Sequence, residues 1–323
     1  MKFPVFDLHC DTALGLLGRE FVPSKELKSN DLHIDLDRAA KLPGYCQFFA
    51  CFTTPWEKLP KPLTVEDVFE RELNVVLNEV NRNPDLIRQA FSPEEIEENR
   101  KQGIMSAVLS IEGPAGFGFD PSLLQMMHTV GFRASTLGWN EQNVLIGSHR
   151  TGGGLTDLGA EYVKECQRLG ILVDVSHCSD EGFWDIMKIT DAPIIASHSN
   201  SRFVCNHSRN LTDDMFRAIC ETGGVAGFNH CAPFVGKESD LDTVADHILH
   251  FLELDPEGHH IALGGDLDGC DVLPKGFEGI QSYPAMAQRL LERGVGEDIL
   301  MNIYWNNAMG VMKRAVRHHQ NQE

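Results

Sequence analysis

The chain has 323 residues, enough to bury a large core, and a single (β/α)8 barrel is about this long. Its formal net charge of −19 disfavours nucleic acid and anionic membrane surfaces as partners. The nine cysteines form no C-x-x-C pair, which predicts reduced thiols rather than a disulfide framework. No long apolar segment marks a signal peptide or a membrane span, so we expect a soluble, cytoplasmic protein without a membrane anchor.

Eight short apolar segments follow one another along the chain, and most lead into a helical pattern. They are continuously apolar rather than alternating, as is typical of parallel strands that are covered on both faces. The predicted strands span residues 3–9, 44–52, 105–112, 132–139, 171–177, 193–198, 223–229 and 260–266.

Helices are predicted between the strands from apolar residues at helical spacing and from capping residues. Thr64 begins a helix that runs to about Arg82, and Ser92 begins a second that stops at Gly103. The thirty or so residues after the first strand, and the glycine-rich segment 147–155, are expected to be loops. Further helices are expected at 121–130, 156–169, 180–189, from about 212, at 241–254, near 283–293 and at 297–317.

This alternation of strands and helices predicts one α/β domain over residues 1–323. Its expected fold is a closed (β/α)8 TIM barrel with extra C-terminal helices. The alternative is an open doubly wound sheet. It is disfavoured because no G-x-G-x-x-G motif follows the first strand, and the glycines at 152–154 follow no predicted strand.

Five of the predicted strands end in side chains that bind metals. Taken alone, each such residue is more often a buried histidine bonded to backbone, or an aspartate that caps a helix. Together they indicate a metal site, because the carboxyl ends of parallel barrel strands meet at one face. Imidazoles and carboxylates suit Zn²⁺, and this number of ligands indicates two metals with a bridging carboxylate. The residues are His9, Asp11, Glu112, His177, His198 and Asp266.

Several motifs resemble the membrane dipeptidase (renal dipeptidase) family, peptidase M19, within the amidohydrolase-like barrels. They are FDLHCDT, GYCQFF, LSIEGP, RLGILVDVSH, PIIASHSNSR, SRN, GGDLDG and WNNAMGVM, and they run nearly from end to end of the chain. The resemblance implies that His9 and Asp11 bind one zinc ion, His177 and His198 bind a second, and Glu112 bridges both.

The resemblance also implies roles for two further residues. Asp266 would handle the proton beside the metal-bound water, and Arg209 of the SRN motif would pair with the terminal carboxylate of a dipeptide. A guanidinium fork binds a carboxylate bidentately, so the second role is physically reasonable. An arginine in a loop would otherwise be expected in a surface salt bridge. The resemblance favours a homodimer.

This chain departs from the family after the fourth strand. Family members carry there a histidine that contacts the substrate carbonyl, whereas Trp139 stands at or beside that place here. Polarisation of the carbonyl is then left to Asn140, to His149 or to the metals alone. Trp139 is either an aromatic wall of the substrate pocket or part of the core.

The expected function is therefore a zinc-dependent dipeptidase that cleaves L-Xaa-L-Xaa or L-Xaa-D-Xaa through a metal-bridging hydroxide. Asp266 and Glu112 are its expected catalytic residues, and Arg209, Trp139 and Asn140 are expected to contact the substrate. One alternative is another two-metal amidohydrolase, such as an N-acyl-amino-acid deacylase or a hydrolase of cyclic amides or lactones. Another is a catalytically silent metal-binding barrel.

Overall fold

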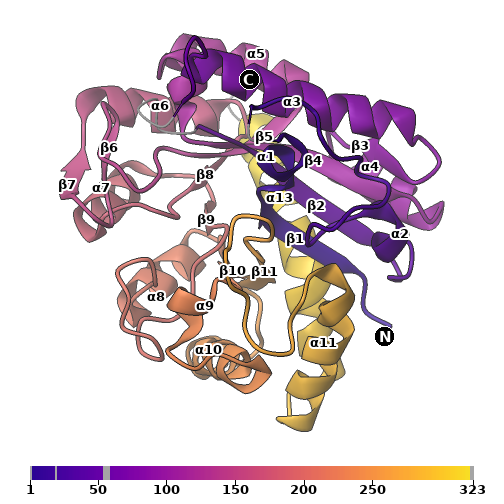
Figure 1. The fold of residues 1–323 in the computed structure, drawn as a ribbon. Helices are drawn as coiled ribbons and strands as arrows, with labels where there is room; N and C mark the ends of the chain where they lie inside the picture. Colours follow the sequence, from indigo (N-terminus) through magenta and orange to yellow (C-terminus); the bar gives the residue numbers. More distant parts are fainter. Residues whose placement is uncertain (1, 19, 54–58, 321–323) are drawn as a thin grey trace.

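The computed structural model describes residues 2–18, 20–53 and 59–320. Eight parallel strands close into a barrel, as predicted (Figure 1). Each strand pairs with the next along the chain, and pairing of β1 with β11 closes the ring. The barrel strands are β1 (Val5–Cys10), β2 (Tyr45–Phe52), β4 (Met105–Glu112), β5 (Phe132–Thr136), β8 (Leu172–Asp174), β9 (Ile194–Ala196), β10 (Val225–Phe228) and β11 (Ile261–Leu263).

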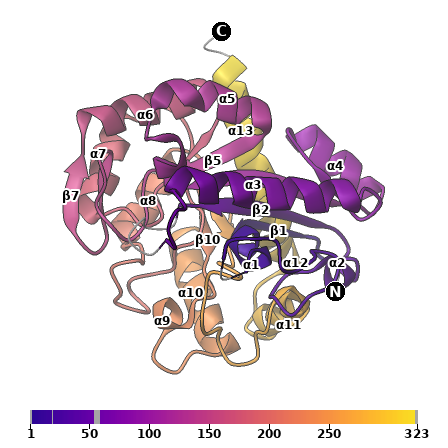
Figure 2. The same cartoon turned by 45° about the horizontal axis from the view of Figure 1, so that its top comes forward.

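Helices surround the barrel (Figures 1 and 2). The first residues of α3 and α4 confirm the predicted capping residues. The Thr64 side chain accepts from the backbone N–H of Asp67 in a capping box, and Ser92 accepts from that of Glu95. No helix in the described ranges is both long and apolar enough to cross a bilayer. The helices are α3 (Val65–Arg82), α4 (Pro93–Lys101), α5 (Leu124–Val130), α6 (Asp157–Arg168), α7 (Asp180–Ile189), α8 (Asp213–Glu221), α9 (Ala232–Val235), α10 (Leu241–Leu254) and α11 (Tyr283–Glu292), with 3₁₀ turns at Pro114–Phe117, Pro121–Leu123 and Ile280–Ser282.

The C-terminal helical segment packs against the barrel's interior core. It consists of α12 (Glu297–Met301), a π-helical turn (Asn302–Asn306) and α13 (Asn307–Gln320). The interior core takes apolar side chains from all eight barrel strands, together with Trp305, Met309 and Met312 from this segment. Several of the strand residues, such as Phe6 and Cys46, lie near the amino ends of their strands. The segment therefore covers the amino end of the barrel, opposite the strand ends that carry the predicted ligands.

Some short elements differ from the expectation. The glycine-rich segment forms an antiparallel hairpin, β6 (Ile146–Ser148) and β7 (Gly152–Leu155), rather than a loop. A Cβ at Gly147 would lie 1.9 Å from the Gly152 carbonyl oxygen, so this close pairing requires glycine. The expected loop after β1 contains α1 (Thr12–Leu16) and α2 (Leu36–Ala39), and β3 (Ile87–Gln89) adds a strand beside β4. Elements this short carry no periodicity that a sequence pattern could reveal.

Candidate active site

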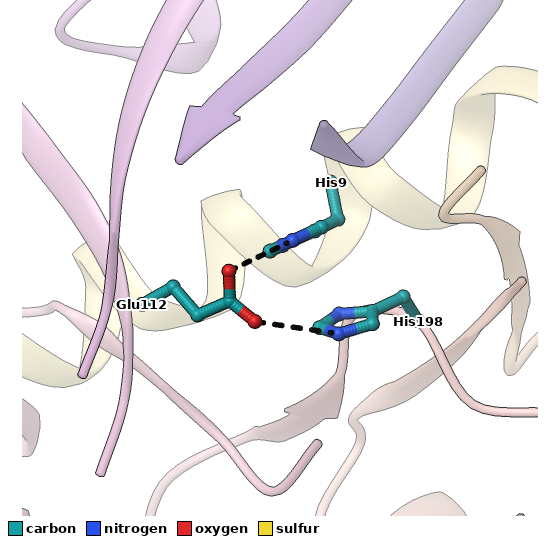
Figure 3. A group of neighbouring side chains, drawn as sticks. All are labelled: His9, Glu112 and His198. Carbon is teal, nitrogen blue, oxygen red and sulfur yellow. Dashed lines mark ion pairs between the residues drawn. The ribbon is translucent and has the colours of Figure 1, made fainter. Parts of the chain in front are cut away.

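Glu112 lies at the centre of the site, at the carboxyl end of β4. One of its oxygens, Oε2, lies 3.5 Å from His9 Nε2, and the other, Oε1, lies 3.8 Å from His198 Nε2. Figure 3 shows both imidazoles directed at the two oxygens of this carboxylate. A third imidazole nitrogen, His177 Nε2, is 3.0 Å from Oε1. A carboxylate that faces histidines through both oxygens has the arrangement of a bridging ligand.

Two further carboxylates complete the cluster around His9. Its Nε2 lies 3.6 Å from Asp11 Oδ2 and 4.0 Å from Asp266 Oδ1. On the other side of Glu112, the Nε2 atoms of His177 and His198 face each other at 3.0 Å. The structure thus brings together all six residues that were predicted from the strand ends.

Irregular backbone conformations direct several of these side chains into the site. Phe6 and Leu8 of β1 face the barrel interior, so strict alternation would direct His9 outward. The register of β1 against β2 shifts between Asp7 and Cys10, which allows His9 to reach the site. His177 and Asp266 adopt left-handed backbone conformations, with φ of 69° and 55°. Such strained positions concentrate at functional sites.

Burial and mutual charge shift the pKa values of the cluster. Burial raises the pKa of Asp11 to about 6, and the neighbouring Glu112 adds to this shift. Burial lowers the pKa of His9, but the charges of Glu112 and Asp11 outweigh burial and raise it well above its usual value. Burial, followed by the charge of Arg209, keeps the pKa of His177 well below its usual value. A cation requires neutral imidazoles, so the low pKa of His177 favours metal binding, whereas His9 would have to release a proton to bind a metal.

The donor set is suited to divalent metal ions. His9 Nε2 is buried and, among the described residues, has no hydrogen-bond partner. A buried polar atom without a partner is costly, and a metal would satisfy it. His9 belongs to two groups of three possible metal ligands. Within each group, the donor atoms all lie within 4.8 Å of one another. The first adds Glu112 and His198, and the second adds Asp11 and Asp266.

In His198 and His177, the ring nitrogen that does not face Glu112, Nδ1, makes a hydrogen bond that fixes the ring. His198 Nδ1 lies 2.7 Å from Ser197 Oγ, and that hydroxyl donates to the buried carboxylate of Asp174. His177 Nδ1 lies 3.0 Å from Asn140 Oδ1. Supporting bonds of this kind orient metal-binding imidazoles.

Sequence reasoning missed Asp174 and Ser197. The signal available was an aspartate within the apolar segment LVDVSH, where a charge needs a buried partner.

Arg209 is buried beside the cluster of histidines and carboxylates. Its Nη1 lies 3.3 Å from Ser199 Oγ, and its Nη2 lies 3.3 Å from the His198 carbonyl oxygen. Its Nε is buried without a hydrogen-bond partner, and no carboxylate of the described chain is within ion-pair distance. Its guanidinium lies 5.4 Å from the centre of the Phe234 ring. A buried guanidinium with spare donors can bind an anionic group of a ligand.

A pocket of about 260 Å³ opens onto the cluster, a size that suits a small molecule. Trp139 and Asn140 both line it, together with Asp11, Glu112 and His177 of the predicted metal site. Trp139 packs edge-on against Phe52, with ring centroids 4.9 Å apart. The indole is therefore part of the pocket wall. His149 does not line the pocket but hydrogen-bonds through Nε2 to Asn140 Oδ1, at 2.8 Å.

Comparison with known proteins identifies relatives of this chain. A family model described as membrane dipeptidase, peptidase family M19, matches residues 1–323. The chain is 35% identical to an uncharacterised dipeptidase of Schizosaccharomyces pombe, over 65% of this chain and 53% of the relative, so the match spans about half of that protein. It is 31% identical to a dipeptidase of Aspergillus oryzae, over 96% of this chain and 78% of the relative.

A solved structure has the same architecture. It is a metallopeptidase from Rhodobacter sphaeroides that carries a phosphinate mimic of the dipeptide L-Ala-D-Ala. The two structures superpose with a TM-score of 0.86 and 27% sequence identity, covering 98% of this chain and 100% of the other.

Proposed function

The chain belongs to the membrane dipeptidase family, peptidase family M19, and from this premise we propose that it is a zinc-dependent dipeptidase with two metal ions. The proposed substrates are free dipeptides, L-Xaa-L-Xaa or L-Xaa-D-Xaa. The observation that carries the proposal is the buried cluster around Glu112, which opens onto a pocket of about 260 Å³. Arg209 does not line this pocket, but its guanidinium packs against Phe234, which does.

The metal-binding residues divide into two groups that share Glu112. His9 and Asp11 would hold one ion, and His177 and His198 the other, with one oxygen of Glu112 toward each group. When bound, the two ions would lower the pKa of a water molecule and polarise the scissile carbonyl. The low pKa of His177 keeps its imidazole ready to act as a ligand.

Asp266 is the proposed proton carrier. Burial, followed by the charge of Asp11, raises the pKa of its carboxyl group. A raised pKa suits a group that takes a proton from water and passes it to the leaving amine. Asn229 Nδ2 donates to Asp266 Oδ2 at 2.9 Å, which holds one oxygen and leaves Oδ1 facing His9.

Arg209 is the proposed partner of the dipeptide's terminal carboxylate. Because its guanidinium is buried and has no carboxylate partner in the described chain, the substrate would supply the missing anion. A fixed carboxylate places the scissile bond at a set distance and so limits substrates to short peptides. Trp139 and Phe52 would form the apolar wall against a substrate side chain.

Asn140 is proposed as a positioning residue as well as part of the pocket. Its Oδ1 accepts from two imidazoles, His177 and His149, at 3.0 and 2.8 Å. This oxygen is therefore engaged and is not free to receive a hydrogen bond from the substrate. The oxygen fixes the orientation of His177, and the Nδ2 group is the part of the amide that could donate to a substrate carbonyl. A cytoplasmic location and a homodimer stay predictions.

The test is a hydrolysis screen of the zinc-reconstituted protein. Free L-L and L-D dipeptides are compared with C-terminally amidated dipeptides, N-acyl amino acids and cyclic amides, and zinc is counted per chain. We expect cleavage of the free dipeptides and about two zinc ions per chain. Preferential hydrolysis of N-acyl amino acids or cyclic amides would contradict the proposal and indicate another kind of two-metal hydrolase. Bound zinc without any hydrolysis would indicate a silent relative.

A further inference from the structure

Two cysteines lie together outside the histidine cluster. Cys231 follows β10 and Cys270 follows β11, two adjacent strands of the barrel. Their sulfur atoms and a carboxylate oxygen of Asp266 all lie within 4.8 Å of one another. Nothing in the proposed dipeptidase mechanism uses either thiol.

Hydrogen bonds hold the three groups in place. Asn229 Oδ1 accepts from the backbone N–H of Cys231 at 2.5 Å, and Asn229 Nδ2 donates to Asp266 Oδ2 at 2.9 Å. The Cys270 thiol donates to the Asp266 carbonyl oxygen at 3.1 Å. A backbone bond from Ala232 to the segment after Cys270 joins the two loops. The donors are thus arranged before any ligand arrives, which reduces the cost of binding.

The cluster can be reached from the active-site pocket. Cys231 and Asp266 both line that pocket, and Cys231 is partly exposed. Cys270 is 8% exposed and lies behind them. An ion that enters the pocket therefore meets one thiol at the wall and the second just beneath it.

We propose that Cys231, Cys270 and Asp266 form a further cation site, selective for thiophilic divalent ions such as Cd²⁺. Two sulfurs and a carboxylate are the ligand types that such ions prefer, whereas Mg²⁺ and Ca²⁺ prefer oxygen alone. Each thiol gives up its proton to solvent as its sulfur binds the ion. No electrons are transferred.

The site has a consequence for catalysis that rests on the proposed function. Asp266 cannot both hold this cation and carry the proton, so an ion bound here inhibits dipeptide hydrolysis. Thiophilic cations are then inhibitors at concentrations above those that load the histidine cluster, and hard cations are not.

The experiment titrates Cd²⁺ into the zinc-loaded protein under a non-thiol reductant. The ultraviolet charge-transfer absorption from thiolate to cadmium reports the site, because the histidine and carboxylate cluster offers no thiolate. The test proteins are wild type and the double variant Cys231→Ser with Cys270→Ser. The control is Cys220→Ser, which removes a partly exposed thiol on α8 outside the active-site pocket.

We expect wild type and the control to bind one extra cadmium ion with the absorption band, and the double variant to lose both. Inhibition of hydrolysis by cadmium should weaken in the double variant alone. An unchanged band and unchanged cadmium count in the double variant would overturn the proposal. The binding measurement does not depend on turnover. If the protein cleaves no dipeptide, that result counts against the proposed function. The absorption band and the cadmium count still decide whether the cation site exists.

Discussion

At the residue scale, the groups proposed to bind metal lie apart from the groups proposed to act on the substrate. Glu112 faces three imidazoles, whereas Asp266 lies at the edge of the cluster with one oxygen held by Asn229. Arg209 touches neither carboxylate within ion-pair distance and has spare donors. Substitutions should therefore affect metal content and turnover separately.

Removal of the Asp266 carboxylate should abolish turnover and spare the metals. In Asp266→Asn the amide keeps the shape and the contact with Asn229 but cannot take a proton. We expect a fall in kcat of about 10²- to 10⁴-fold, the usual contribution of general acid–base catalysis. Zinc per chain should be unchanged by elemental analysis. A near-normal rate would show that another group carries the proton.

Replacement of Arg209 should discriminate between substrates. Arg209→Met keeps the apolar stem and removes the charge, so a free terminal carboxylate loses its partner. A hydrogen bond to a charged group is worth about 1.5–3 kcal/mol, so kcat/KM for a free dipeptide should fall by at least ~10-fold. The amidated analogue should change little. Arg217→Met, at an exposed surface pair with Asp214, is the control, and equal losses on both substrates would contradict the role.

Asn140 should affect metal binding. Asn140→Leu removes the acceptor at 3.0 Å from His177 Nδ1 while keeping a similar volume. Loss of such a supporting bond typically costs about 10- to 100-fold in metal affinity. Competition with a chelator, followed by zinc per chain, measures the change. Wild-type zinc affinity together with a raised KM would instead favour a direct contact with the substrate.

At the scale of elements, local capping signals set the helix boundaries. α3 begins where Thr64 and Asp67 exchange side-chain-to-backbone hydrogen bonds. The same principle places Ser92 at the start of α4 and Thr212 at the start of α8. These caps stabilise the scaffold without touching the site.

Loss of the cap on α3 should lower stability and leave activity intact. Thr64→Ala removes the acceptor for the N–H of Asp67 and should reduce the free energy of unfolding by about 1 kcal/mol. Urea denaturation measures the change. Thr64→Ser keeps the oxygen and serves as the matched control. An equal loss in Thr64→Ser would assign the effect to the threonine methyl group rather than to the cap.

At the scale of the whole molecule, one buried acidic side chain makes the stability of the fold depend on pH. Glu72 of α3 is fully buried, accepts from the Phe52 N–H, and has its other oxygen unpartnered among the described residues. Burial raises the pKa of this carboxyl group well above its usual value. The folded protein therefore holds a proton that the unfolded chain releases above about pH 4, so stability falls as pH rises from there toward the folded pKa.

Glu72→Gln should remove this pH dependence. Glutamine imitates the protonated acid, so the variant should gain stability over wild type at about pH 8 and gain little at about pH 5. Urea denaturation of the metal-free protein at both values measures the difference, with Glu70→Gln on the same helix as the exposed control. An equal gain at both pH values would show that the charge of Glu72 is not the cause.

The sequence by itself determined the strands, most helices and the set of residues that gather at one face of the barrel as proposed metal ligands. These follow from local patterns: continuous apolar runs, caps, and ligand types at strand ends, all of which a parallel barrel brings to one face. The motif resemblance added the proposed role of Arg209, which no local pattern carries.

Only the tertiary structure decided how the side chains meet, because those contacts join residues far apart in the chain. The register shift in β1 turns His9 into the site, and Asn140 reaches His177 from another loop. The cluster of Cys231 with Cys270 likewise exists only because β10 and β11 are neighbours in the closed sheet. Local patterns report which face a residue occupies, whereas distances and partners come from packing between elements.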